Sequence, residues 1–147
     1  MSLTSTPVLH QTPYSVPVEA QRIAAFAQAI GETREIYYNP AAAHAEGYRD
    51  IPIPPTMMFA LSLKGPDPFA WMADIGFDLR NLLHGEQGFD YHQPVCAGDI
   101  LTFYPRISNC YSRKGGELTF VVRDTRVDRQ DGVHVADLHN VLIRRRI

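Results

Sequence analysis

Four side chains that can exchange protons or bind metal ions lie close together in the stretch HGEQGFDYH. They are His84, Glu86, Asp90 and His92, all at even-numbered positions. Residues two apart in a β-strand project to the same face, so a strand here would place all four on one side of a sheet. His84 and His92 would then lie roughly 27 Å apart, which is too far for one metal ion. Asp90 and His92 could act as an acid/base couple, but solvated or interface side chains give the same pattern.

Other candidate residues stand alone in the sequence. Glu32 follows an expected helix, and His44 lies on an expected alanine-rich helix. Either side chain could be merely solvated or could take part directly in catalysis. The chain has no Gly-x-Ser-x-Gly elbow, no glycine-rich phosphate loop and no His-Glu-x-x-His motif. Cys96 and Cys110 have no Cys-x-x-Cys partner, so we expect reduced thiols and no metal site. These residues alone do not define a reaction.

The composition is that of one globular domain spanning residues 1–147. Hydrophobic residues make up 45% and charged residues 20%, and the net charge is −2 with histidines neutral. The charges are mixed rather than clustered, which argues against nucleic acid or an anionic membrane as a partner. The polar start of the chain lacks the features of a secretory signal, so we expect a cytoplasmic protein. Residues 1–13 are expected to be an irregular segment.

The elements that must position these residues change type along the chain. The first half predicts helices at 17–30, with Pro17 in the first turn, at 40–46 after a capping Asn39, and at 56–63. The helix at 56–63 is apolar on almost every side, so it belongs in a core. One further helical turn is expected at 69–73.

From residue 84 the hydrophobic period becomes two, which predicts strands. Lys114-Gly115-Gly116 and Asp131-Gly132 are turn sequences between the last three strands. Pro105 predicts a bulge or an edge position, because proline cannot donate to a strand ladder. The fold class is therefore α+β, an antiparallel sheet that wraps a buried helix. The expected strands are 84–94, 99–112, 116–129 and 133–146.

Four segments together resemble the MaoC-type (R)-specific enoyl-CoA hydratases and 3-hydroxyacyl-thioester dehydratases. The segments are FAQAIGETREIYYNP, GYRDIPIPPTMMFAL, LLHGEQGFDYHQPVCAGDILT and YSRKGGELTFVVRDTRV. The likeness is greatest to the N-terminal half-domain, or partner subunit, of fatty-acid-synthase-type dehydratases. It implies a single hot-dog fold, a long central helix wrapped by an antiparallel sheet, that pairs with a second hot-dog as a homodimer or heterodimer. It also implies hydration or dehydration of 2-enoyl and 3-hydroxyacyl thioesters of CoA or acyl-carrier protein, without a cofactor.

The resemblance also marks departures from the catalytic pattern. Catalytic members carry Gly-Asp-x-Asn-Pro-x-His, and the matching stretch here is GETREIY, with Glu32 for aspartate and Tyr37 for histidine. Tyrosine, with an ordinary pKa near ~10, accepts protons poorly at neutral pH compared with histidine near ~6.5. Members of the family use a backbone N–H at the start of the central helix to stabilise the thioester oxyanion. Here two prolines precede that start, leaving Thr56 and Met57 as donors.

These departures favour a degenerate subunit that shapes the acyl tunnel for a catalytic hot-dog partner. The HGEQGFDYH strand would then be architectural, part of the tunnel wall and of the contact with the second hot-dog. The alternatives are a non-catalytic acyl-thioester-binding or scaffold protein, or a self-sufficient hydratase. In a self-sufficient enzyme Glu32 would be the base, Tyr37 an acid or water-orienting group, and the Thr56 N–H the oxyanion donor. His44 and His84 are further candidates to supply the missing imidazole. The residues expected to bind substrate are Pro55, Thr56, Met57 and Met58, and we expect one of the two methionines to face the acyl tunnel.

Overall fold

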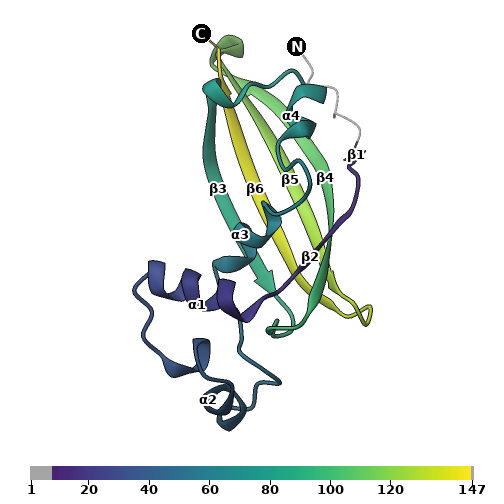
Figure 1. The fold of residues 1–147 in the computed structure, drawn as a ribbon. Helices are drawn as coiled ribbons and strands as arrows, with labels where there is room; N and C mark the ends of the chain where they lie inside the picture. The colour runs from purple at the N-terminus through teal and green to yellow at the C-terminus, as the bar shows by residue number, and fades with distance from the viewer. Residues whose placement is uncertain (1–7, 147) are drawn as a thin grey trace.

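The computed structural model describes residues 8–146 and contains one antiparallel sheet with helices packed across one face and beyond one end (Figure 1). The sheet order is β1-β4-β5-β6-β3, and β2 also pairs with β4. The α+β prediction and the meander of the last three strands are confirmed. The strands are β1 (Leu9–His10), β2 (Tyr14–Pro17), β3 (Leu82–Tyr91), β4 (Ile100–Arg113), β5 (Leu118–Arg129) and β6 (His134–Arg145).

The central helix α3 packs against the sheet and is shorter than the resemblance implied. It has six residues, of which Met58 and Leu61 are fully or almost fully buried in the core. Pro54 and Pro55 stop it from starting earlier, and Pro66 lies soon after its end. The expectation of a long central helix is therefore wrong. The helices are α1 (Ala20–Ala29), η1 (Glu35–Tyr37), α2 (Pro40–Ala45), α3 (Met57–Ser62), α4 (Ala70–Asp74), η2 (Leu79–Asn81) and η3 (Lys114–Gly116).

The start of the described chain differs from the expectation in two places. Pro17 does not begin a helix; it ends β2, opposite Ile100, and α1 begins at Ala20. The expected irregular segment 1–13 contains β1, which pairs with β4 at Ile107 and Arg106. Residues 1–7 of that segment lie outside the described part. The predicted cap of the second helix is confirmed, because the Asn39 side chain accepts a hydrogen bond from the Ala41 N–H.

Pro105 is neither at a free edge nor at a bulge. It lies inside β4 opposite Thr125, and its carbonyl accepts a hydrogen bond from the Gln11 N–H at 3.0 Å. The N–H and C=O of one residue in an antiparallel strand point the same way, so the missing donor faces the gap between β1 and β2. The proline therefore costs no ladder bond to β5, and the bulge of β4 comes later, after Ile107.

A bulge in β3 breaks the even-numbered face that the sequence predicted. The pairing with β6 shifts between His84 and Glu86, and a Cβ on Gly85 would come within 2.8 Å of the Ile143 Cδ1 atom. His84 consequently lies against the ring of Phe59 from α3, with ring centroids 5.0 Å apart. Asp90 instead pairs with Asp137. The four polar residues of the stretch therefore do not form one site.

In the described part of the chain, the sheet has a free outer edge, and the helices are too short to cross a membrane. The outer edge of β3 has no neighbouring strand within residues 8–146, and Leu83 on it is 56% exposed. None of the helices in that range has the length and apolar character needed to cross a bilayer.

Candidate functional site

A cavity of about 330 Å³ lies between the segment after β3, the 3₁₀ helix η1 and the segment that leads into α3. Tyr37 enters it from η1, Pro55 from the approach to α3, and Tyr91 and His92 from the end of β3. Its walls are mainly apolar with phenol and imidazole groups among them, which suits a small, largely apolar ligand. The lining residues are Tyr37, Tyr48, Pro52, Ile53, Pro55, Tyr91, His92, Gln93, Pro94 and Val95.

A buried carboxylate braces the wall of this cavity. Asp99 is 2% exposed and accepts hydrogen bonds from both terminal nitrogens of Arg49, at 3.2 and 2.9 Å, and from the Cys96 N–H at 2.9 Å. The backbone beside it pairs with the cavity segment, because the Ile53 N–H donates to the Val95 carbonyl and the Ala97 N–H to the Ile51 carbonyl. The Ala-Gly-Asp sequence before β4 is thus a structural brace.

Tyr37 is the predicted site residue that lies most clearly in the cavity. Its side chain is buried, and the Arg34 guanidinium lies over its ring at 6.0 Å. Burial raises the pKa of Tyr37 above the ordinary value, and Arg34 only partly offsets this. Its neighbour Tyr91 has a pKa raised by burial to about 12. Both phenols are protonated at neutral pH, so they can donate hydrogen bonds but cannot serve as bases.

Glu32 is not among the residues that line the cavity. Its Oε1 atom accepts a hydrogen bond from the Arg34 N–H at 2.9 Å, and its backbone carbonyl accepts one from the Tyr38 hydroxyl. The carboxylate therefore holds the backbone of the residue directly before η1 (Glu35–Tyr37). Of this predicted pair, only Tyr37 lines the cavity.

The start of α3 offers one backbone donor. The Met57 N–H donates to the Pro54 carbonyl at 3.0 Å, whereas the Thr56 N–H makes no hydrogen bond to any described residue. Thr56 is exposed, and Pro55 beside it lines the cavity. Met57 and Met58 are 3% and 0% exposed and belong to the core cluster rather than to the cavity lining.

The two reserve histidines lie elsewhere, and a third histidine lines the cavity. The His44 ring is hydrogen-bonded to the Arg49 carbonyl at 2.9 Å, and His84 is hydrogen-bonded to Asn140. The imidazole in the cavity lining is His92. The sequence pointed to His92 only as a partner of Asp90, but its hydrogen-bond partner is Asp137 on β6, 45 positions away.

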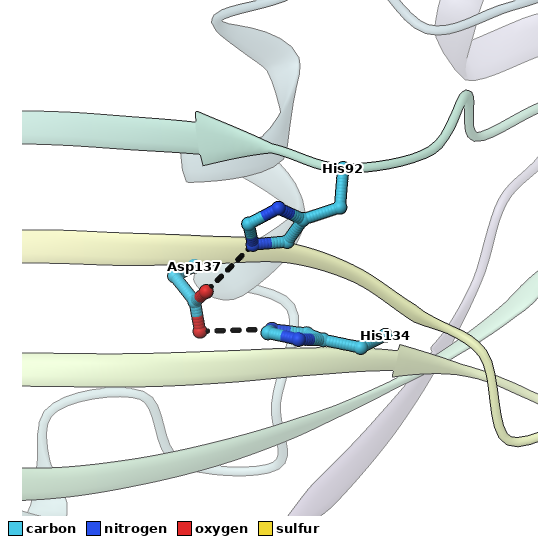
Figure 2. Close-up of side chains that lie close together, drawn as sticks. All are labelled: His92, His134 and Asp137. Carbon is cyan, nitrogen blue, oxygen red and sulfur yellow. Dashed lines mark hydrogen bonds and ion pairs between the residues drawn. The ribbon is translucent and has the colours of Figure 1, made fainter.

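His92, His134 and Asp137 form a compact cluster beside the end of β3 (Figure 2). The His92 Nε2 atom lies 2.8 Å from one carboxylate oxygen of Asp137, and the His134 Nε2 atom lies 2.9 Å from the other. A register shift near Val135 lets His134 and Asp137 meet although they are three apart on β6. Burial raises the pKa of Asp137, but hydrogen bonds from His92 and His134 outweigh it and leave the pKa below its usual value.

Comparisons with known proteins point to one family. The model of the FAS1-like dehydratase domain region family matches residues 6–138. A UPF0336 protein of Streptomyces avermitilis is 35% identical over 133 residues, which cover 90% of this chain and 86% of that protein.

Solved structures show the same fold at low sequence identity. A chain of the C-terminally truncated HadBC complex, a (3R)-hydroxyacyl-ACP dehydratase of Mycobacterium tuberculosis, superposes with a TM-score of 0.79 at 20% identity, covering 97% of this chain and 98% of that one. A chain of the ChsH1–ChsH2 complex of Mycobacterium tuberculosis superposes with a TM-score of 0.75 at 22% identity, covering 93% and 89%.

Proposed function

The chain belongs to the FAS1-like dehydratase domain region family and has a MaoC-like hot-dog fold, and from this premise we propose that it serves the reversible hydration of 2-enoyl thioesters. Its role is that of a degenerate subunit. It supplies part of the acyl-binding groove, and a second hot-dog with an intact Gly-Asp-x-Asn-Pro-x-His motif supplies the acid/base pair. The thioester carrier is CoA or acyl-carrier protein.

The observation that carries this proposal is a cavity that Tyr37 lines and Glu32 does not, so the stretch that resembles the catalytic motif supplies no carboxylate or imidazole to it. Tyr37 matches the catalytic histidine in the sequence resemblance, and burial raises its pKa. Glu32 matches the aspartate in the sequence resemblance, but it does not line the cavity, and its carboxylate accepts a hydrogen bond from the Arg34 N–H. A general base needs hydrogen-bond reach of its substrate and a pKa near the working pH. Tyr37 lines the cavity but its raised pKa makes it a poor base, and Glu32 does not line the cavity.

The start of α3 supports a role in binding the thioester. The Thr56 N–H has no partner among residues 8–146 and stands next to Pro55 in the cavity wall. An N–H in that position can donate a hydrogen bond to a thioester oxygen and stabilise the negative charge that develops on it. Met57 and Met58 lie directly behind it in the core, and we propose that the acyl chain passes along this side of α3 when the second hot-dog completes the groove.

The free edge of β3 supports a partner of the same fold. Along its outer edge this ten-residue strand exposes backbone donors and acceptors, which makes that edge a template for a further strand. Two of the similar solved structures are complexes of two named components, HadBC and ChsH1–ChsH2. We propose that this chain pairs along β3 with a catalytic hot-dog in the cell and with a second copy of itself when it is alone.

Co-expression tests the subunit proposal. The chain is produced alone and together with a hot-dog protein from the same genome that carries the intact motif, and crotonyl-CoA hydration is measured for each preparation. The proposal expects a stable heterodimer that is active and whose activity falls when Thr56 is replaced by proline, which removes the N–H. Thr12→Pro, at an exposed position that does not line the cavity, is the matched control. Failure of every such partner to co-purify would refute the subunit role.

A further inference from the structure

We propose that His92, His134 and Asp137 form a binding site for a divalent transition-metal ion, with zinc as the first candidate. This inference goes beyond the proposed function and does not depend on it. The three side chains come from the segment after β3 and from β6, and Figure 2 shows both imidazole rings directed at the same carboxylate. Two imidazole nitrogens and one carboxylate are a recurrent set of protein ligands for zinc and its neighbours.

The positions of the ligand atoms fit one ion. One nitrogen from each histidine and one Asp137 oxygen all lie within 4.8 Å of one another. Zinc binds such atoms at about 2.0–2.2 Å, so tetrahedral ligands stand roughly 3.3 Å apart. The present hydrogen-bond distances of 2.8 and 2.9 Å are slightly shorter than this. The two hydrogen bonds run to different Asp137 oxygens, so an ion would replace them through side-chain rotations that bring both imidazole nitrogens and one oxygen to the tetrahedral spacing.

The charges around the cluster favour a cation. Asp90 stands directly across from Asp137 on β3, and like charges in that arrangement destabilise a sheet. Asp128 stands across from His134 on β5. The nearby counter-charge is Arg126, which stands directly across from Asp137 on β5 and whose Nε atom is 2.8 Å from Asp128. Three carboxylates and one guanidinium leave an excess of negative charge beside two imidazoles.

The exposure of the cluster sets the kind of site. The side chains of His92, His134 and Asp137 are 42%, 30% and 41% exposed, so three protein ligands would leave the remaining positions to water. Nitrogen ligands select zinc, nickel or copper over magnesium and calcium, which prefer oxygen. Because His92 also lines the cavity, the ion would sit at the cavity's rim.

A second pair on the sheet provides an internal control. The His139 Nδ1 atom lies 2.6 Å from an Asp124 oxygen, with exposures of 49% and 30%. The chemistry and exposure resemble those of the cluster, but only one imidazole is present. Replacing His139 therefore removes a surface His–Asp contact without removing a ligand of the proposed site.

The test is calorimetric titration of Zn²⁺ into the full chain, produced without a polyhistidine tag and treated with chelator. We expect one ion per chain. His92→Ala, His134→Ala and Asp137→Asn should each weaken binding at least about 10-fold, the loss typical of removing even an outer-shell partner. His139→Ala should bind as the wild type does, and Mg²⁺ should give no saturable binding. Circular dichroism establishes that each variant is folded.

Two results would overturn the proposal. One is the absence of saturable Zn²⁺ binding to the wild-type chain at millimolar metal. The other is binding that survives unchanged in the three ligand variants, or that falls equally in His139→Ala, since either would place the ion elsewhere.

Discussion

Asp99 offers a direct test of how the cavity wall is held. Replacing it with alanine removes both hydrogen bonds to Arg49. It also leaves the N–H of Cys96 without its hydrogen-bond partner, and Cys96 is only 1% exposed, so water cannot readily replace that partner. A buried N–H left unpaired costs about 1–3 kcal/mol. The Arg49 side chain is 55% exposed, so its ion pair adds only about 0–1 kcal/mol after solvent screening. The expected loss of unfolding free energy is therefore roughly 1–4 kcal/mol.

Thermal and urea denaturation measure this loss. A chain of this size loses about 2–4 °C of Tm for each kcal/mol. Asp99→Asn should cost less, because the amide oxygen can still accept from the Cys96 N–H. Glu19→Gln is the matched control, since it removes an ion pair with Arg22 in which both side chains are about half exposed. Equal stability of Asp99→Ala and Glu19→Gln would refute the reasoning that Asp99 braces the wall.

Three further predictions concern the core, the buried phenols and the free edge. Met58→Ala should destabilise the fold by about 2–5 kcal/mol in urea titrations, because the side chain is 0% exposed, and an unchanged midpoint would contradict the core assignment. Burial raises the pKa values of Tyr14 and Tyr37 above 10.0, so the stability they contribute is present below about pH 10 and is lost as the pH rises further. Phenolate absorbance should show this, and simultaneous titration of all tyrosines near pH 10 would disprove it. Leu83→Lys should weaken self-association in sedimentation without unfolding the chain, and an unaltered dimer would exclude the β3 edge.

The sequence predicted the strands well because their signals are local. The period-two pattern and the glycines at the turns are sufficient to place β4, β5 and β6 within a few residues of their observed ends. Gly115, Gly116 and Gly132 all have positive φ, which is what the turn sequences required. These features depend on neighbouring residues and not on the rest of the fold.

The candidate site was harder to predict because it depends on distant contacts. Asp137 meets His92 across 45 positions, and no spacing rule connects them. The bulge at Gly85 undoes the even-numbered-face argument for residues 84–92, and the register shift near Val135 lets His134 meet Asp137. The length of α3 is likewise limited by the prolines around it and not by its apolar residues.

The most direct test of the central claim is the hydration of crotonyl-CoA by the purified chain alone. We predict a rate no faster than the uncatalysed reaction, because the Tyr37 phenol is protonated and the Glu32 carboxylate lies outside the cavity. The same background rate is expected for Glu32→Ala and Tyr37→Phe. Enzymatic turnover by the wild-type chain that is lost in either variant would contradict the degenerate-subunit account.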